Sequence, residues 1–147
     1  MNRKRGFADI AVVGLVAVAA VLSILWFRGR DTDGIRADAR YRGQVREAVA
    51  TVEAMGPYRF KNLNIRLTTP KAEKVVGGLP VFWVASEQRY VGGHWTGGGR
   101  IAVARDANGN IHNGALIHEL WHVLLGQHGI PMEDHHRIMR QYGVYGA

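Results

Sequence analysis

The chain has 147 residues and a formal net charge of +7, from 19 basic and 12 acidic residues, and it contains no cysteine. This length suits one modest domain, and the lack of cysteine excludes disulfides, thiolate metal sites and cysteine nucleophiles. The first 30 residues carry five basic residues and one acid, so the remainder, with 14 basic and 11 acidic residues, is only mildly basic and nucleic acid is not an expected partner.

An uncharged apolar stretch, residues 10–27, follows a short basic N-terminus. Its length of about 18 residues lies near the lower limit for a membrane-spanning helix. Trp26, Phe27 and Arg28 at its end are typical of a membrane interface. We therefore expect residues 1–30 to form a single-pass membrane anchor. A cleaved signal peptide is an alternative, although its apolar core is usually shorter, about 7–15 residues; a buried core helix is another.

The charges around this stretch bear on its orientation. Arg3, Lys4 and Arg5 favour a cytoplasmic N-terminus, which places the following domain in the periplasm or outside the cell. Arg28 and Arg30 favour the opposite orientation by simple counting, but long domains often cross a membrane regardless of charge. We expect an exported domain tethered to the membrane.

The remaining residues, 31–147, are expected to form a small α+β domain. Residues 35–55 have apolar side chains near helical spacing, and Gly56-Pro57 marks the end of that helix. Strands are expected at 63–68, 79–85 and 100–105, where apolar residues alternate or cluster in short runs.

Residues 113–125 predict a largely apolar helix. Asn113 is its expected N-cap, and Gly126 and Gly129 are its expected stops. The sequence after the cap contains leucine, isoleucine, valine and tryptophan on every side, so this helix is expected to lie in the core.

This helix contains the segment His118-Glu119-Leu120-Trp121-His122. Four residues is just over one helical turn, so both imidazoles leave the same face, at the separation needed to share one tetrahedral zinc ion. Burying two histidines and a glutamate in an apolar helix is costly without partners, and a metal ion supplies one. The alternative is a pair of hydrogen-bonded core histidines with Glu119 at the surface.

The His-Glu-x-x-His segment resembles that of the zincin metallopeptidases. The resemblance implies a zincin-like domain with a short, mostly antiparallel sheet and zinc held by His118 and His122. It also implies that Glu119 is the general base and that the strand before the helix, residues 100–105, pairs with an extended peptide substrate. The alternative for residues 100–105 is an ordinary core strand. The resemblance covers this helix strongly and the first hundred residues hardly at all.

A third protein ligand is required for a catalytic zinc site. His128 stands ten residues after His118, as does the third histidine of the metzincin pattern, but that pattern needs glycine where Leu125 stands. Here the glycine is Gly126, one position late, so the turn that would aim His128 is displaced.

His135 is the preferred third ligand. Pro131 predicts the start of a second short helix, on which His135 shares a face with Ile138 and Met139, whereas His136 faces solvent. The spacing Gly-x-Pro-x-x-Asp-His that ends at His135 also resembles a segment of small bacterial and phage His-Glu-x-x-His proteins. Glu133 and Asp134 remain alternative ligands, with a sufficient role as acids at a helix N-terminus.

The expected function is that of a membrane-anchored zinc peptidase acting on a peptide or protein. Zinc would activate a water molecule and polarise the scissile carbonyl, and Glu119 would take and return the proton. Two alternatives stay open: a tethered zinc-binding interaction module without catalysis, and a cell-envelope accessory protein in which the motif is coincidental.

Overall fold

The computed structural model describes residues 33–146. Within this range, Gly34 onward forms one compact unit, with helices and a mixed sheet around a single apolar core. Among residues 33–146, no helix is both long and apolar enough to cross a bilayer. The membrane anchor predicted for residues 1–30 lies outside the described residues.

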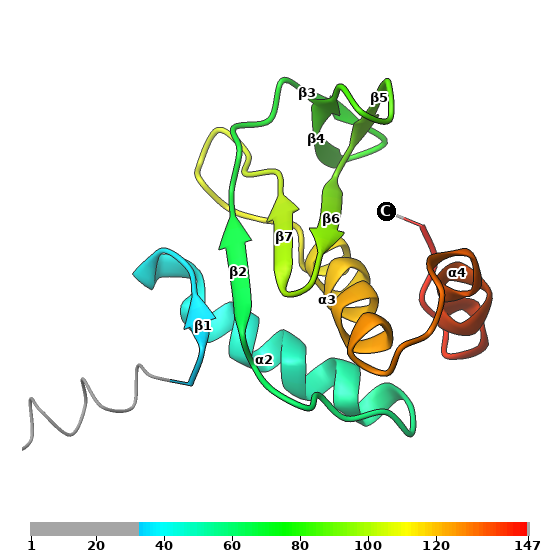
Figure 1. The fold of residues 1–147 in the computed structure, drawn as a ribbon. Helices are drawn as coiled ribbons and strands as arrows, with labels where there is room; N and C mark the ends of the chain where they lie inside the picture. Colours follow the sequence, from blue (N-terminus) through cyan, green and yellow to red (C-terminus); the bar gives the residue numbers. More distant parts are fainter. Residues whose placement is uncertain (1–32, 147) are drawn as a thin grey trace, which may run out of the picture. The chain divides into compact units, whose positions relative to one another are not determined.

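Ten helices and strands are present in the described range (Figure 1). In chain order they are β1 (Ile35–Arg36), α2 (Ala39–Met55), β2 (Ile65–Thr68), β3 (Lys74–Val76), β4 (Leu79–Val84), β5 (Arg89–Val91), β6 (Gly93–Gly97), β7 (Arg100–Val103), α3 (Asn113–Gln127) and α4 (Met132–Gln141). The α+β class expected from the sequence is therefore confirmed.

The larger sheet has the strand order β1-β2-β7-β6. Strand β2 runs parallel to both β1 and β7, and only β6 pairs with β7 in the antiparallel sense. The expectation of a mostly antiparallel sheet is wrong for this sheet, because helix α2 connects β1 to β2 as a crossover and returns the chain in the same direction. The smaller sheet, β3-β4-β5, is antiparallel throughout.

The predicted helix over residues 35–55 begins later than expected, at Ala39. Ile35 is instead part of β1, where it pairs with Ile65 of β2. Asp38 is the N-cap, and its Oδ1 accepts a hydrogen bond from the backbone N–H of Arg40 at 3.1 Å. The helix ends before Gly56, as predicted.

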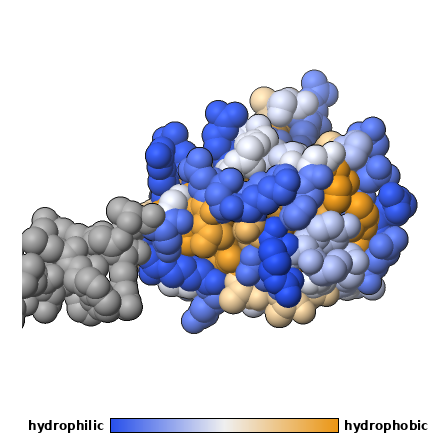
Figure 2. All heavy atoms as spheres, turned by 60° about the horizontal axis from the view of Figure 1, so that its bottom comes forward, coloured by the Kyte–Doolittle hydropathy of each residue, from blue (hydrophilic) through white to orange (hydrophobic). Residues whose placement is uncertain are grey.

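Helix α3 lies in the middle of the core. Ten of its residues are buried, and its neighbours are α2, α4, β6 and β7. The apolar side chains that the larger sheet turns toward the helices are Ile65, Leu67, Ile101 and Val103. Both α2 and α3 therefore bury their apolar sides against one face of this sheet (Figure 1). The face of the molecule drawn in Figure 2 is correspondingly covered mainly by hydrophilic side chains, with small apolar patches between them.

The ends of α3 differ in detail from the prediction. His112, rather than Asn113, is the N-cap, since its Nδ1 accepts a hydrogen bond from the N–H of Ala115 at 3.2 Å. Gly126 lies inside the helix, where a Cβ would come within 3.1 Å of the Trp95 ring. The chain turns at Gly129, which has a φ of +68°, a value that favours glycine.

A candidate metal centre on helices α3 and α4

The buried face of α3 carries His118, Glu119 and His122. All three side chains are buried although all three are polar. The four-residue spacing places both imidazoles on one face of the helix, as the sequence predicts, with their Nε2 atoms 3.3 Å apart.

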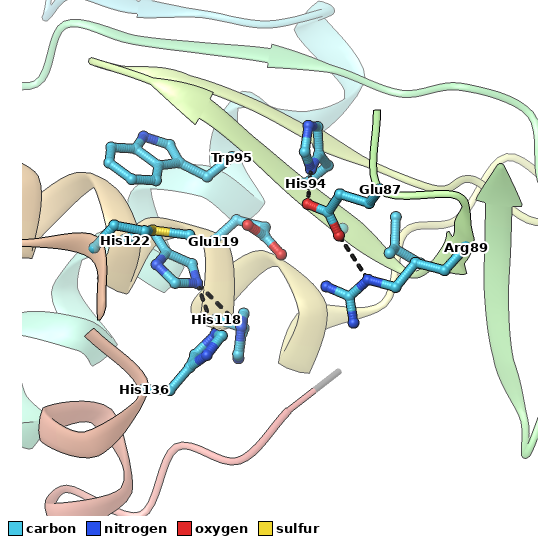
Figure 3. Close-up of a pocket in the computed structure, with 11 residues that line it drawn as sticks. Glu87, Arg89, His94, Trp95, His118, Glu119, His122 and His136 are labelled. Atoms are coloured by element: carbon cyan, nitrogen blue, oxygen red, sulfur yellow. Dashed lines mark hydrogen bonds and ion pairs between the residues drawn. The ribbon is translucent and has the colours of Figure 1, made fainter. Parts of the chain in front are cut away.

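A third imidazole comes from α4. His136 places its Nε2 3.2 Å from Nε2 of His122, so the Nε2 atoms of His118 and His136 both face that of His122 (Figure 3). One nitrogen from each of the three rings lies within 4.8 Å of the other two, so the group can hold a metal ion.

This donor set fits a tetrahedral metal ion. Two nitrogens bound to zinc at 2.0–2.1 Å in tetrahedral geometry stand about 3.3 Å apart. The Nε2–Nε2 distances of 3.2 Å (His136 to His122) and 3.3 Å (His118 to His122) agree with that separation. The residues therefore offer three imidazole nitrogens and leave a fourth position open.

The third histidine differs from the preferred sequence prediction. His135 is fully buried, as expected from its apolar helix face, but its Nδ1 meets Nδ1 of His122 at 2.9 Å, on the far side of that ring from the cluster. One residue along a helix is a rotation of about 100°. That rotation places His136, which is exposed as a residue, on the side of the His122 ring where its Nε2 lies.

The alternative ligand His128 lies away from the cluster. It is the C-cap of α3, and its Nε2 interacts with the carbonyl oxygen of Arg59 at 2.8 Å. Glu133 and Asp134 are in the first turn of α4, and Asp134 pairs with Arg137 at 2.9 Å. Neither carboxylate is in the three-histidine group.

Backbone and ring contacts hold the two histidines of α3. The Nδ1 atom of His118 interacts with the carbonyl oxygen of Tyr145 at 3.1 Å. The ring of Trp95 stacks on that of His122, with centroids 5.6 Å apart and planes 5° from parallel. Trp95 is itself held by a hydrogen bond from its Nε1 to the carbonyl oxygen of Gly98.

The electrostatics of the cluster keep its imidazoles neutral at pH 7. Burial lowers the pKa of His118, and burial together with the neighbouring imidazoles lowers the pKa of His122 to about 3. Burial, together with Arg140, also lowers the pKa of His136. Neutral imidazoles have lone pairs to offer, which is the state a metal ion requires.

Glu119 occupies a different environment from an ordinary surface carboxylate. Burial, helped by the nearby charge of Glu87 and opposed by Arg89, raises its pKa to about 8. Its side chain packs on the backbone of Gly93, where a Cβ would lie only 2.7 Å from both its Cγ and its Oε1. Glycine at this position therefore makes room for the carboxylate.

A small pocket joins these groups and opens to solvent. Besides the cluster and Glu119, its lining includes Glu87, Arg89, His94, Trp95 and Met132 (Figure 3). Sequence reasoning did not single out these five residues as site residues. Each lies on or beside a short strand or in the first turn of α4, and only the tertiary fold brings them to the histidines.

The strand that borders the pocket is also different from the one expected. Residues 100–105 were expected to lie at the cleft edge, but β7 is an interior strand between β2 and β6. Strand β6 lies at one edge of the larger sheet, and its residues Gly93, His94 and Trp95 line the pocket.

Comparison of the chain with protein-family models, with curated proteins and with solved structures finds no match. The resemblance to zincins therefore rests on the His-Glu-x-x-His segment alone.

Proposed function

We propose that this protein is a zinc-dependent peptidase whose metal ligands are His118, His122 and His136. The observation that carries the proposal is the convergence of three Nε2 atoms in a pocket that also contains the buried carboxylate of Glu119. A purely structural zinc site is closed by four protein ligands, whereas a catalytic site has three and an open position.

Zinc is the ion that this donor set favours. Three neutral imidazoles without thiolate or carboxylate ligands suit a tetrahedral, borderline-soft divalent ion. When bound, such an ion would supply Lewis-acid polarisation of a carbonyl group and activation of a water molecule.

The chain's own residues supply the remaining functions. Glu119 accepts a proton from a water molecule in the pocket and donates it to the leaving amine, and its raised pKa suits a group that takes and returns a proton near neutral pH. Gly93 and the buried wall around it fix the position of that carboxylate. Among the described strands β6 pairs only with β7, so its other edge can accept an extended peptide as a further strand.

The proposal is tested with Glu119→Gln in the full chain. We expect the variant to bind zinc as the wild type does and to cleave a mixture of peptides at least about 100-fold more slowly, in line with the loss of a general base. Glu133→Gln is the matched control, because Glu133 is an exposed acid in the first turn of α4. Zinc binding without any peptide cleavage by the wild type would instead favour an interaction module.

We further propose that residues 1–30 tether the domain to a membrane, with the domain on the periplasmic or extracellular side. The proposal is supported by the uncharged run 10–27 and its basic flanks. Extraction of cell membranes at alkaline pH tests it: the protein is expected to stay with the lipid, and its release into the supernatant would contradict the tether.

A further inference from the structure

His135 lies behind His122 in a chain of contacts that ends on the backbone. Its ring is fully buried. Its Nδ1 is 2.9 Å from Nδ1 of His122, and its Nε2 is 2.9 Å from the carbonyl oxygen of Ile130. Both nitrogens of His135 are therefore engaged, and neither faces the three converging Nε2 atoms.

These contacts determine where the protons lie. A carbonyl oxygen only accepts, so Nε2 of His135 carries the hydrogen in that contact. With that hydrogen on Nε2, Nδ1 of His135 offers its lone pair to Nδ1 of His122 at 2.9 Å. Nδ1 of His122 must then donate, which leaves Nε2 of His122 with a free lone pair.

We propose that His135 is a positioning residue that sets the tautomer and the ring orientation of His122. The inference rests on the proposed metal site, because the freed Nε2 of His122 is the atom that faces His118 and His136. Metal-binding histidines usually donate their second ring N–H to a carboxylate, a carbonyl or water. Here the imidazole of His135 takes the place of that acceptor, and its Nε2 donates in turn to the carbonyl oxygen of Ile130.

The other histidine of α3 is fixed more directly. Nδ1 of His118 interacts with the carbonyl oxygen of Tyr145 at 3.1 Å, so it too is the nitrogen that carries the hydrogen. Both ligands are thus held in the Nδ1–H tautomer, one by a carbonyl oxygen and one through His135. The lone pairs point into the cluster before any metal binds.

The experiment is a measurement of histidine tautomers by long-range ¹H–¹⁵N NMR on the metal-free full chain in detergent. In the wild type we expect His122 as the Nδ1–H tautomer. Three substitutions are compared: His135→Asn keeps an acceptor oxygen near the place of Nδ1, His135→Leu removes it, and His128→Leu is the control. We expect only His135→Leu to give mixed tautomers of His122 and to lower zinc affinity about 10–100-fold.

Two results would overturn this inference. One is an Nε2–H tautomer of His122 in the wild type, or a tautomer that His135→Leu leaves unchanged. The other is a folded His135→Asn variant that loses zinc entirely, which would make His135 a ligand. Failure of the wild type to bind zinc would contradict the proposed function alone, because the tautomers are measured without metal.

Glu87, Arg89 and His94 line the wall of the pocket opposite the histidine cluster. Glu87 joins two pocket residues, with one oxygen 3.0 Å from Nδ1 of His94 and the other 2.6 Å from Nε of Arg89. The alternation of β5 directs Arg89 and Val91 to the pocket, while Tyr90 packs on Trp83 at the opposite face. Arg89 is thus held at its inner nitrogen and remains 66% exposed.

One side of the Arg89 guanidinium remains available for a ligand. Its Nε contact with Glu87 leaves two terminal amino groups, which make no hydrogen bond or ion pair with any residue between 33 and 146. Figure 3 shows the guanidinium on the side of the pocket that faces Glu119 and His118. Two parallel N–H groups match the two oxygens of a carboxylate.

We infer that Arg89 binds a carboxylate of the substrate, which makes the substrates peptides with a free C-terminus or with an acidic side chain beside the cleaved bond. This inference also rests on the proposed peptidase function. The two sources of the carboxylate are distinguished by comparing a peptide acid with its C-terminal amide, and an aspartate-containing peptide with its asparagine analogue.

The test compares wild type, Arg89→Gln and the control Arg137→Gln, which removes a similar Arg–acid pair outside the pocket. For carboxylate-bearing peptides we expect Arg89→Gln to raise KM about 10–100-fold with little change in kcat, the size expected for a charged hydrogen bond. Equal use of acid and amide, and of aspartate and asparagine, by the wild type would overturn the inference.

A binding measurement separates this inference from the peptidase proposal. An N-acetylated dipeptide acid is titrated into the metal-free full chain and followed by NMR. Weaker binding by Arg89→Gln than by Arg137→Gln supports the carboxylate site even if no peptide is cleaved. Equal binding by the wild type and both variants contradicts it.

Discussion

At the scale of single residues, the site depends on which nitrogen of each imidazole faces the cluster. His118 and His122 present Nε2 inward because their Nδ1 atoms are engaged by Tyr145 and His135. His136 completes the group although it is an exposed residue, because its ring contacts the buried rings of His118 and His122. The adjacent histidines of α4 thus contact His122 from its two sides.

The role of His136 predicts a selective loss of metal. His136→Asn is expected to lower zinc affinity by more than the roughly 10–100-fold effect of losing an outer contact, because a direct ligand is removed. Isothermal titration calorimetry with zinc measures this. The control His128→Asn is expected to bind zinc normally, since His128 contacts Arg59 rather than the cluster. Unchanged zinc affinity in His136→Asn would argue against the assigned ligand.

A second prediction at this scale concerns Gly93. In Gly93→Ala the new methyl group would lie 2.7 Å from Cγ and Oε1 of Glu119, so the carboxylate must move. We expect zinc binding to be retained and kcat to fall about 10–100-fold, because small misplacements of a catalytic group are costly. Peptide hydrolysis measured beside zinc content checks this, and normal kcat in the variant would show that Glu119 needs no such placement.

At the scale of elements, the site combines one long helix with a shorter helix and short strands. Helix α3 is long and buried, and it sets two histidines and the glutamate by its own periodicity. Helix α4 and the short strands β5 and β6 bring the rest. The site's precision therefore depends on how α4 packs on α3 and how β6 pairs with β7.

A substitution in helix α2 tests the fold that surrounds the site. Gly43 is an exposed position inside this helix, and a Cβ there would meet no atom within 4 Å. Gly43→Ala is expected to raise the free energy of unfolding by about 0.5–1 kcal/mol, because alanine loses less backbone entropy in a helix. Denaturant unfolding measures the change, and zinc binding should stay the same. A destabilised variant would contradict the position assigned to α2.

The sequence predicts the elements of this fold whose side chains follow a regular local spacing. The pair His118 and His122 follows from helix periodicity, and α2 follows from its apolar spacing and the stop at Gly56. The third histidine does not, because the rotation of α4 depends on the turn at Gly129 and on packing against α3. A two-residue strand such as β1 is too short for any periodic signal.

The pocket wall is the part least accessible from sequence. Glu87, Arg89 and His94 lie on or beside strands far along the chain from α3, and no spacing rule connects them with the histidines. The parallel pairing of β2 with β1 and β7 was also missed, since alternation of apolar residues does not tell a strand's direction. Tertiary pairing decides both features.

At the scale of the whole molecule, metal binding and stability are expected to be linked. The ligands come from two helices that are separated by the turn at Gly129, so an ion held by both stabilises the folded state. Free zinc at 100 times its Kd adds about 2.7 kcal/mol to the free energy of unfolding.

This linkage predicts a rise in Tm of roughly 10 °C on saturation with zinc, given the size of the domain. Thermal unfolding of the full chain with zinc and with a chelator checks the prediction. The rise should vanish in His136→Asn. An equal rise in that variant would place the stabilising zinc elsewhere in the molecule.

The proposed peptidase activity requires one zinc ion held by the three-histidine cluster, with Glu119 beside it. The most direct measurement is a titration of zinc into the metal-free full chain while cleavage of a peptide mixture is followed by mass spectrometry. We predict that cleavage rises with zinc and saturates at one ion per chain, and that Glu119→Gln binds the same ion without comparable cleavage. Zinc saturation with no cleavage by the wild type would contradict the proposed peptidase function. Cleavage that does not depend on zinc or on Glu119 would contradict it as well.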